Sequence, residues 1–133
     1  MKLTKIFIVD DLETTLYGLA KCIEKIEHTK IIGMAKSGKE ALELIRVCKP
    51  DILVTDVEMP VMDGVELLKI IRKDFVKIKV VACCMYRRLW VIQNLLKNGI
   101  NGVVSKQSLK TDISKAIDGA LSGQTSILLI LMK

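Results

Sequence analysis

Carboxylates that follow apolar segments are the residues of this sequence best suited to chemistry. Asp10 and Asp11 come directly after the apolar segment Ile6–Val9, and Asp56 closes the apolar segment that begins at Ile52. A carboxylate at the C-terminal end of a buried strand lies at the rim of a parallel sheet, where α/β proteins place their ligand sites. If the two strands are neighbours, three carboxylates share one small cleft, and their mutual repulsion favours a bound cation.

A lysine completes this group of charged residues. Lys106 follows Gly102–Ser105, at the end of another apolar segment, so we expect it on the same rim. Beside a Mg²⁺ ion, which prefers oxygen ligands, a carboxylate can act as the nucleophile towards a phosphoryl donor. The aspartyl phosphate carries about −1.5 to −2 charges, which the ion and the lysine ammonium group would balance. Singly, an Asp pair before a helix is usually an N-cap and a lysine after a strand a surface residue, so the prediction depends on their joint placement.

The elements that position these residues are short β-branched segments that alternate with helical patterns. The expected strands are Lys5–Val9, Ile31–Ala35, Ile52–Thr55, Val80–Cys83 and Gly102–Val104. Nearly continuous apolar strands joined by amphipathic helices predict a parallel sheet that is covered on both faces. Right-handed crossovers then predict a single doubly wound (βα)5 sandwich, an α/β fold with five parallel strands in the order 2-1-3-4-5. In that order the first and third strands are neighbours, as the shared cleft requires.

Capping residues predict where several helices begin and end. The segments Ser37–Glu40 and Asp63–Glu66 each have the pattern of a capping box at a helix N-terminus. Pro50 is expected to stop the helix that Ser37 starts, and Gly99 to end the fourth helix in a left-handed conformation. Four apolar residues mark the fourth helix, namely Leu89, Ile92, Leu95 and Leu96.

Length and composition fit one globular domain. Half of the 133 residues are hydrophobic, and the longest apolar run, Ile127–Met132, is much shorter than the ~20 residues of a membrane span. We therefore expect a cytoplasmic protein without a signal peptide and without a membrane partner. The formal charge is +6, but the 21 lysines and arginines are spread along the chain. This spread favours an acidic protein partner over direct binding of nucleic acid by this segment.

The cysteines predict packing rather than metal binding. Cys22, Cys48, Cys83 and Cys84 form no C-x-x-C pair, and the only histidine is His28, so we expect no zinc site. All four cysteines lie among apolar residues, which predicts small core side chains in a reducing compartment. A redox role for the adjacent pair Cys83 and Cys84 is the less favoured alternative, because neighbours in one strand rarely form a disulfide.

Together these motifs resemble the receiver domain of a two-component response regulator. The matching residues are Asp10-Asp11, Asp56 within Thr-Asp-Val-Glu-Met-Pro-Val-Met-Asp-Gly, and Lys106, and the resemblance covers about residues 3–121. It implies a flavodoxin-like fold with Asp56 as the phosphoacceptor, and Mg²⁺ held by Asp11 and Asp56, with Asp10 bound directly or through water. It also implies a further ligand from the backbone carbonyl of Glu58 and a contact between Lys106 and the phosphoryl group. A domain of this kind is a signalling domain rather than an enzyme.

Two positions depart from the pattern of the family that the chain resembles. The family usually has Ser or Thr at the end of the fourth strand and often an aromatic residue three positions before the lysine. This sequence has Cys84 and Val103 there. A thiol is a weak hydrogen-bond donor and a poor acceptor. We therefore expect the phosphoryl chemistry to be intact and its coupling to the output surface to be altered, because a ligand shifts an equilibrium only through contacts that differ between two states.

The C-terminal segment is similar to the receiver end of LuxR-type regulators, which continue into a helix-turn-helix DNA-binding domain. We expect residues 1–121 to form the receiver domain and residues 122–133 to be a linker with an apolar tail, or the start of an output domain. The resemblance implies a sensor histidine kinase as phosphodonor and DNA contact only through an output domain. The apolar tail can pack on the domain, pair with a sheet edge or enter a dimer interface. We expect self-association, if any, through the fourth helix, the helix Ser108–Leu121 or this tail.

Several alternatives remain open from the sequence. One is a degenerate receiver that acts as a phosphate-independent interaction module, and another is a stand-alone regulator that acts by protein contact. An aspartate-dependent phosphatase would need an acid–base Asp two residues after its nucleophile, where this chain has Glu58. A dinucleotide-binding oxidoreductase is disfavoured because no G-x-G-x-x-G follows the first strand.

Overall fold

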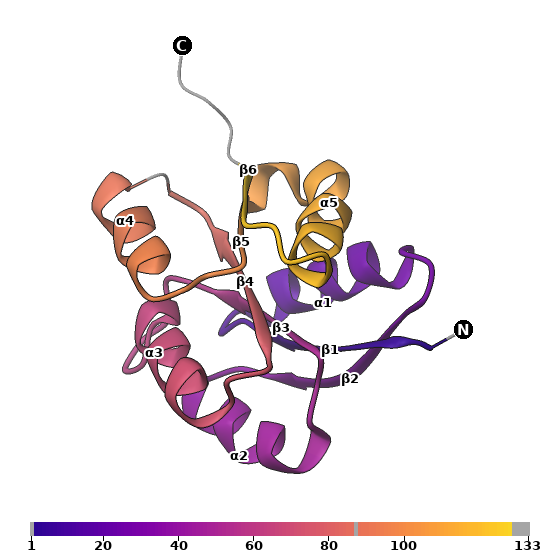
Figure 1. The fold of residues 1–133 in the computed structure, drawn as a ribbon, viewed down its shortest axis with the longest axis horizontal. Coiled ribbons are helices and arrows are strands. Elements are labelled where there is room, and N and C mark those ends of the chain that lie inside the picture. Colours follow the sequence, from indigo (N-terminus) through magenta and orange to yellow (C-terminus); the bar gives the residue numbers. More distant parts are fainter. Residues whose placement is uncertain (1, 87, 129–133) are drawn as a thin grey trace.

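Strands and helices alternate along the chain in the computed structural model, which describes residues 2–86 and 88–128 (Figure 1). The strands are β1 (Thr4–Val9), β2 (Thr29–Ala35), β3 (Ile52–Asp56), β4 (Lys79–Cys84), β5 (Gly102–Ser105) and β6 (Ser126–Leu128). The helices are α1 (Glu13–Glu24), α2 (Gly38–Cys48), α3 (Gly64–Asp74), α4 (Leu89–Lys97), the 3-10 helix η1 (Lys106–Ser108) and α5 (Leu109–Leu121). Within the described residues, every helix falls short of the length and apolarity that a membrane-spanning helix requires.

The sheet is parallel, and its strands follow the order β2-β1-β3-β4-β5-β6. The order predicted for the first five strands is therefore confirmed, but the predicted number of five strands is wrong. Ser126–Leu128 adds a sixth strand, which pairs in parallel with Gly102–Val104 of β5. This strand has only three residues and follows a polar turn. It therefore shows no alternation of apolar and polar positions from which a strand could be predicted. Pairing with a sheet edge was one of the possibilities for the apolar tail, and Ser126–Leu128 pairs in this way. Residues 129–133 of the tail lie outside the described residues.

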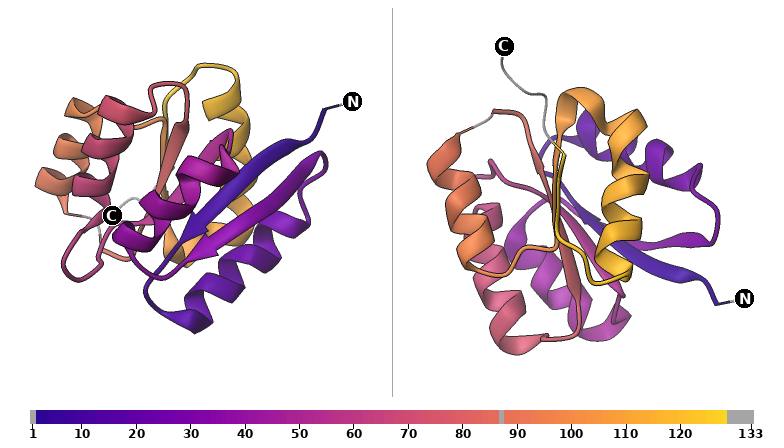
Figure 2. Two further views of the ribbon diagram at one scale, coloured as in Figure 1. Left: turned by 90° about the horizontal axis from the view of Figure 1, so that it is seen from below. Right: turned by 45° about the horizontal axis from the view of Figure 1, so that its top comes forward.

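Helices cover both faces of the sheet (Figures 1 and 2). Helices α1 and α5 lie on one face, and α2, α3 and α4 lie on the other. Side chains alternate between the two cores along each strand. In β1, for example, Ile6 and Ile8 pack towards α1 and α5, whereas Phe7 and Val9 pack towards the opposite layer. The core is aliphatic, as the small number of aromatic residues in the sequence requires.

The predicted caps form, with one difference. At α3, the Asp63 side chain accepts the Glu66 N–H at 2.9 Å and the Glu66 carboxylate accepts the Asp63 N–H at 3.2 Å, which completes the capping box. At α2, Ser37 Oγ accepts the Glu40 N–H at 3.1 Å, but the Glu40 carboxylate accepts the Lys36 N–H instead. That second capping box is therefore only half formed.

The fourth helix forms and ends as predicted, and it buries only part of its apolar surface. Gly99 follows α4 with a φ of +80°, the left-handed conformation expected there. Of the four apolar residues that marked this helix, Leu89 is 69% exposed and Leu96 47% exposed. The buried residues of this helix are Val91, Ile92 and Leu95. Apolar residues occur on both sides of this helix, and periodicity alone therefore could not show which stripe faces the core.

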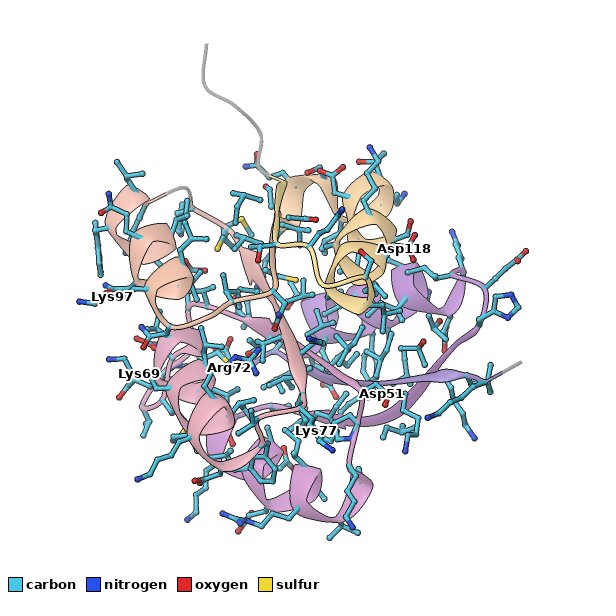
Figure 3. All side chains as sticks on the ribbon, viewed as in Figure 1. Asp51, Lys69, Arg72, Lys77, Lys97 and Asp118 are labelled. Atoms are coloured by element: carbon cyan, nitrogen blue, oxygen red, sulfur yellow. The ribbon has the colours of Figure 1, made fainter. Side chains whose placement is uncertain are left out.

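A partly buried arginine ties the end of α3 to the loops beneath α4. Arg72 Nε donates to the Gly99 carbonyl at 3.0 Å, and Nη1 donates to the Ile78 carbonyl at 2.6 Å. Its Nη2 donates to Asn101 Oδ1, which also accepts the Val80 N–H at 2.8 Å. Figure 3 shows Arg72 extending from α3, with Lys69 and Lys97 on the outer surface of the same helical layer. These contacts join α3, β4 and the end of α4 over long sequence separations.

The loop between β3 and α3 contains a strained residue. Val61 has a φ of +68° and a fully exposed side chain. A β-branched residue is unfavourable in the left-handed region, whereas asparagine is tolerated there. We expect Val61→Asn to raise the free energy of unfolding by about 1 kcal/mol, measured by urea denaturation. Val76→Asn is the matched control, because Val76 is also exposed but has no positive φ; equal effects of both substitutions would contradict the strain.

Candidate functional site

Two neighbouring strands bring three carboxylates together at one rim of the sheet. β1 pairs with β3, and Asp10 and Asp56 at their C-terminal ends are each only 2% exposed. Asp11 is half-buried beside them, and one carboxylate oxygen from each of the three residues lies within 4.8 Å of the others. Asp10 Oδ1 accepts the Leu12 N–H at 3.0 Å, which fixes this side chain at the entry to α1. The three acids that the sequence singled out therefore form one cluster.

Lys106 reaches this cluster from the end of β5. Its Nζ lies 2.9 Å from Asp10 Oδ2 and 2.9 Å from Asp56 Oδ1, and the lysine side chain is only 9% exposed. The three residues converge because they share one side of the sheet. Each comes two positions after a residue that packs towards α1 and α5, namely Ile8, Val54 and Val104.

Burial and charge set the protonation of this cluster. Burial raises the pKa of the Asp56 carboxyl to about 7, which Lys106 opposes and the negative charges of Asp10 and Glu58 reinforce. Burial alone would lower the pKa of Lys106, but its hydrogen bond to Asp10 and its ion pairs with Asp10 and Asp56 outweigh burial and raise it. At neutral pH the ammonium is therefore charged, while Asp56 holds its proton to a higher pH than an ordinary carboxyl group does.

The donor set of this cluster fits a divalent cation. Three carboxylates face one ammonium group, so negative charge is in excess. Asp56 Oδ1 is also the one buried side-chain polar atom in the described part of the chain without a hydrogen bond. Its 2.9 Å separation from Lys106 Nζ makes an ion pair, but the angles fall outside the range of a hydrogen bond. Hard oxygen ligands with uncompensated charge suit an ion such as Mg²⁺ or Ca²⁺.

The N-terminus of α3 lies close to the end of β3. A Cβ on Gly64 would lie 2.6 Å from the Asp56 carbonyl oxygen and 2.8 Å from Val57 Cα, so only glycine permits this approach. The Glu58 carboxylate accepts the Met85 N–H at 3.4 Å and so leans towards the loop after β4. The contribution predicted for Glu58 is that of its backbone carbonyl, not of this side chain.

Cys84 is the last residue of β4, which pairs with β3, and the charges of Asp56 and Lys106 are near enough to affect its thiol. It is 2% exposed and belongs to the core beneath α3 and α4, together with Val103. Burial raises the pKa of the Cys84 thiol to about 12, reinforced by Glu58 and Asp56. Burial likewise raises the pKa of Cys83. Both thiols therefore stay protonated at neutral pH, which opposes a redox role because the thiolate is the reactive form.

Two hydroxyl groups near the site were missed by sequence reasoning. Thr55 Oγ1 donates to the Asp56 carbonyl at 2.9 Å, and Ser105 Oγ accepts the Gln107 N–H at 3.1 Å. Both residues are buried. The signal available in the sequence was a polar residue directly before Asp56 and another directly before Lys106, inside otherwise apolar strands.

The fold is a doubly wound, flavodoxin-like α/β sandwich with its acidic cluster at the C-terminal rim of the strands. The family described as response regulator receiver domain matches residues 6–118. The chain therefore belongs to the response regulator receiver family, which consists of signalling domains.

Curated relatives are regulators of the LuxR type. The chain is 33% identical to response regulator protein VraR of Staphylococcus saprophyticus over 113 residues, which are 85% of this chain and 54% of VraR. It is also 33% identical to transcriptional regulatory protein LnrK of Bacillus subtilis, over 90% of this chain and 54% of LnrK. The chain thus spans about half the length of the curated relatives it matches.

Solved structures show the same architecture. The isolated REC domain of RcsB from Salmonella enterica serovar Typhimurium, in the presence of the phosphomimetic BeF3-, superposes with a TM-score of 0.88. The identity is 26%, and the match covers 95% of this chain and 94% of that domain. A two-component response regulator of the LuxR family from Aurantimonas superposes with a TM-score of 0.89 at 26% identity, covering 94% of this chain and 89% of that one.

Proposed function

We propose that this chain is a phosphoacceptor receiver domain in which Asp56 takes a phosphoryl group with the help of Mg²⁺. One observation carries the proposal: three carboxylates and the ammonium group of Lys106 converge at one rim of the sheet. The cluster is costly as it stands, since burial and neighbouring negative charge hold the Asp56 pKa far above its ordinary value. A cluster of this kind is expected where function requires it.

Each residue of the cluster has a separate role in the proposed phosphoryl transfer. Asp11 and Asp56, with Asp10 and the Glu58 carbonyl, would hold the Mg²⁺ ion, which neutralises charge on the transferring group. A carboxylate oxygen of Asp56 attacks phosphorus, and the bond to the leaving group breaks with its electron pair on that group. The Lys106 ammonium, already 2.9 Å from Asp56 Oδ1, binds a phosphoryl oxygen. Loss of the phosphoryl group to water is the only other reaction proposed, so the domain is not an enzyme acting on separate substrates.

The proposed phosphodonor is a sensor histidine kinase, whose phosphohistidine must reach Asp56. A groove beside the site is lined by residues of α1, of the turn after β5 and of the start of α5, including Thr15, Gly18, Lys106 and Thr111. This groove gives a helical donor access to the ammonium group. The site would act in the cytoplasm, where the kinase domains of such systems work.

The proposed output is transcriptional. VraR and LnrK extend beyond the matched region, and RcsB is described as dimers bound to DNA. We propose residues 1–121 as the receiver domain, residues 122–133 as its connection to the output, and DNA contact only through an output domain. Exposed apolar side chains on α4, Leu89 and Trp90, and on α5, Leu121, support self-association through these helices.

The second candidate is a phosphate-independent interaction module. Cys84 and Val103 favour it, because the usual hydroxyl and aromatic groups are absent at these positions. The buried acids oppose it, because a module that only binds proteins has no need for three carboxylates within 4.8 Å of one another. The intact cluster therefore favours the phosphoacceptor.

Intact-mass spectrometry after incubation with acetyl phosphate tests the proposal. We expect one phosphoryl adduct in the presence of Mg²⁺, and no adduct in EDTA or in Asp56→Asn. Asp51→Asn is a control for other aspartates, because Asp51 lies at the opposite end of β3 and should keep the adduct. Absence of an adduct in the wild-type chain, or its persistence in Asp56→Asn, would refute the assignment.

Cys84→Thr is expected to strengthen the conformational response to phosphorylation. Threonine restores a hydroxyl that can donate to a phosphoryl oxygen, whereas the protonated thiol donates weakly. The measurement is the change in backbone amide NMR shifts of α4 when Mg²⁺ and the phosphomimetic BeF3- are added. Cys84→Ala, which removes the thiol without adding a donor, is the control. If Cys84→Thr shows the same amide shifts as the wild type, the missing hydroxyl does not limit the conformational response of this domain.

A further inference from the structure

The turn that carries Lys106 is held by a buried serine. Ser105 is the last residue of β5, and its side chain caps the 3-10 helix Lys106–Ser108. Ser105 Oγ accepts the Gln107 N–H at 3.1 Å, and the residue is only 6% exposed. Because this bond spans Lys106, it restrains the backbone dihedral angles on both sides of the lysine.

Ser105 and Lys106 project to opposite sides of the sheet. Val103 packs towards α3 and α4, and Val104 packs towards α1 and α5. Because successive side chains of a strand point to opposite faces of the sheet, Ser105 points to the same face as Val103, and Lys106 to the same face as Val104. The serine hydroxyl therefore does not compete with the ammonium for the carboxylates, and its effect on the site passes through the main chain.

The position of the ammonium depends on that main chain. A lysine has a flexible four-carbon stem, yet Nζ lies 2.9 Å from both Asp10 Oδ2 and Asp56 Oδ1. The stem leaves the backbone inside the capped turn, so a rotation of the Lys106 backbone is amplified along its length. A displacement of about 1 Å at a reacting group can cost about 100-fold in rate.

We propose that Ser105 is a positioning residue that aims the Lys106 ammonium at Asp56 and thereby sets the rate of phosphoryl uptake. The inference rests on the proposed transfer of a phosphoryl group to Asp56. Removal of the hydroxyl leaves the Gln107 N–H without its partner, and the turn can then relax. Ser105 acts through Lys106 and touches neither the phosphoryl group nor the ion.

The rate of phosphorylation by acetyl phosphate with Mg²⁺ tests this role. Ser105→Ala is expected to slow uptake about tenfold, and Ser105→Thr, which keeps the capping hydroxyl, should restore a rate close to that of the wild type. Ser108→Ala is the matched control, because Ser108 lies in the same turn and its hydroxyl donates to Asp112 Oδ2 at 3.0 Å. That substitution should leave the rate unchanged.

A double variant separates positioning from general damage to the fold. In a Lys106→Met background, Ser105→Ala should cause no further loss of rate, because the group it positions is gone. An equal fold-loss in both backgrounds would overturn the inference.

A second readout needs no phosphoryl chemistry. In metal-free protein, the ¹⁵N signal of the Lys106 ammonium should shift in Ser105→Ala and stay in place in Ser108→Ala. If the wild type takes up no phosphoryl group, the proposed function fails, and this signal still decides whether Ser105 positions Lys106. A wild-type rate in Ser105→Ala with an unmoved ammonium signal would overturn the inference alone.

Discussion

Lys106→Met should lower the free energy of unfolding by about 3–5 kcal/mol at about pH 8 in the absence of divalent cations. The lysine is the only cation of the described residues that pairs with Asp10 and Asp56, and all three side chains are more than nine-tenths buried. Methionine has a similar length and fills the space of the stem. The loss is therefore the electrostatic cost of buried carboxylates without a counter-charge. Urea denaturation measures it.

A surface ion pair in the same chain provides the control for this loss. Lys36 Nζ lies 3.2 Å from Glu13 Oε1, but both side chains are more than half exposed. Lys36→Met should change the free energy of unfolding by less than about 1 kcal/mol, because exposed pairs are screened by water. Similar losses in both variants would contradict the electrostatic account of Lys106.

A double variant tests which carboxylate the lysine supports. Asp56→Asn removes one of the two buried charges that face Lys106, so the loss caused by Lys106→Met should be smaller in that background. Additive effects would show that Lys106 stabilises the fold through packing of its stem rather than through Asp56.

The rim of the sheet was predictable from the sequence because its determinants are local. Each charged residue comes at the end of a largely apolar segment, so strand ends could be assigned before their contacts were known. Asp10, Asp56 and Lys106 then follow from strand order, since the C-terminal ends of parallel strands share one edge. The glycine after Asp63 was expected as part of a turn, and the structure adds its contact with the Asp56 backbone.

The features that were missed depend on contacts between distant segments. β6 forms because the segment Ser126–Leu128 pairs with the free edge of β5. The buried stripe of α4 depends on how the helix lies on α3 and the sheet. Arg72 bonds to Asn101, 29 positions later in the sequence. Ser105 looks like an ordinary polar residue at a strand end until its partner Gln107 is seen. No local pattern encodes such pairings, and only the folded chain reveals them.

The stability of the metal-free protein should fall as the pH rises from about 4 to about 7, by at most about 4 kcal/mol. Burial raises the pKa of Asp56 from 3.8 to about 7 in the folded state. The folded state therefore binds a proton more tightly than the unfolded state, and its advantage is complete below pH 3.8 and lost above about pH 7. Lys106, whose pKa is raised, stays charged throughout this window, and Cys84, with a pKa of about 12, stays protonated.

Asp56→Asn and Mg²⁺ should each remove this decline for a different reason. The asparagine cannot ionise, so the variant should be more stable than the wild type above about pH 7 and equal to it near pH 4. Mg²⁺ binds the ionised carboxylates of the folded state, so it should raise wild-type stability most at high pH and have little effect on Asp56→Asn.

Urea denaturation across this pH range, in EDTA and in Mg²⁺, provides the measurement. Asp118→Asn, at an exposed position of α5 (Figure 3), should show the wild-type profile. A decline in Asp56→Asn equal to that of the wild type would contradict the assignment, because the decline would then come from a group other than Asp56.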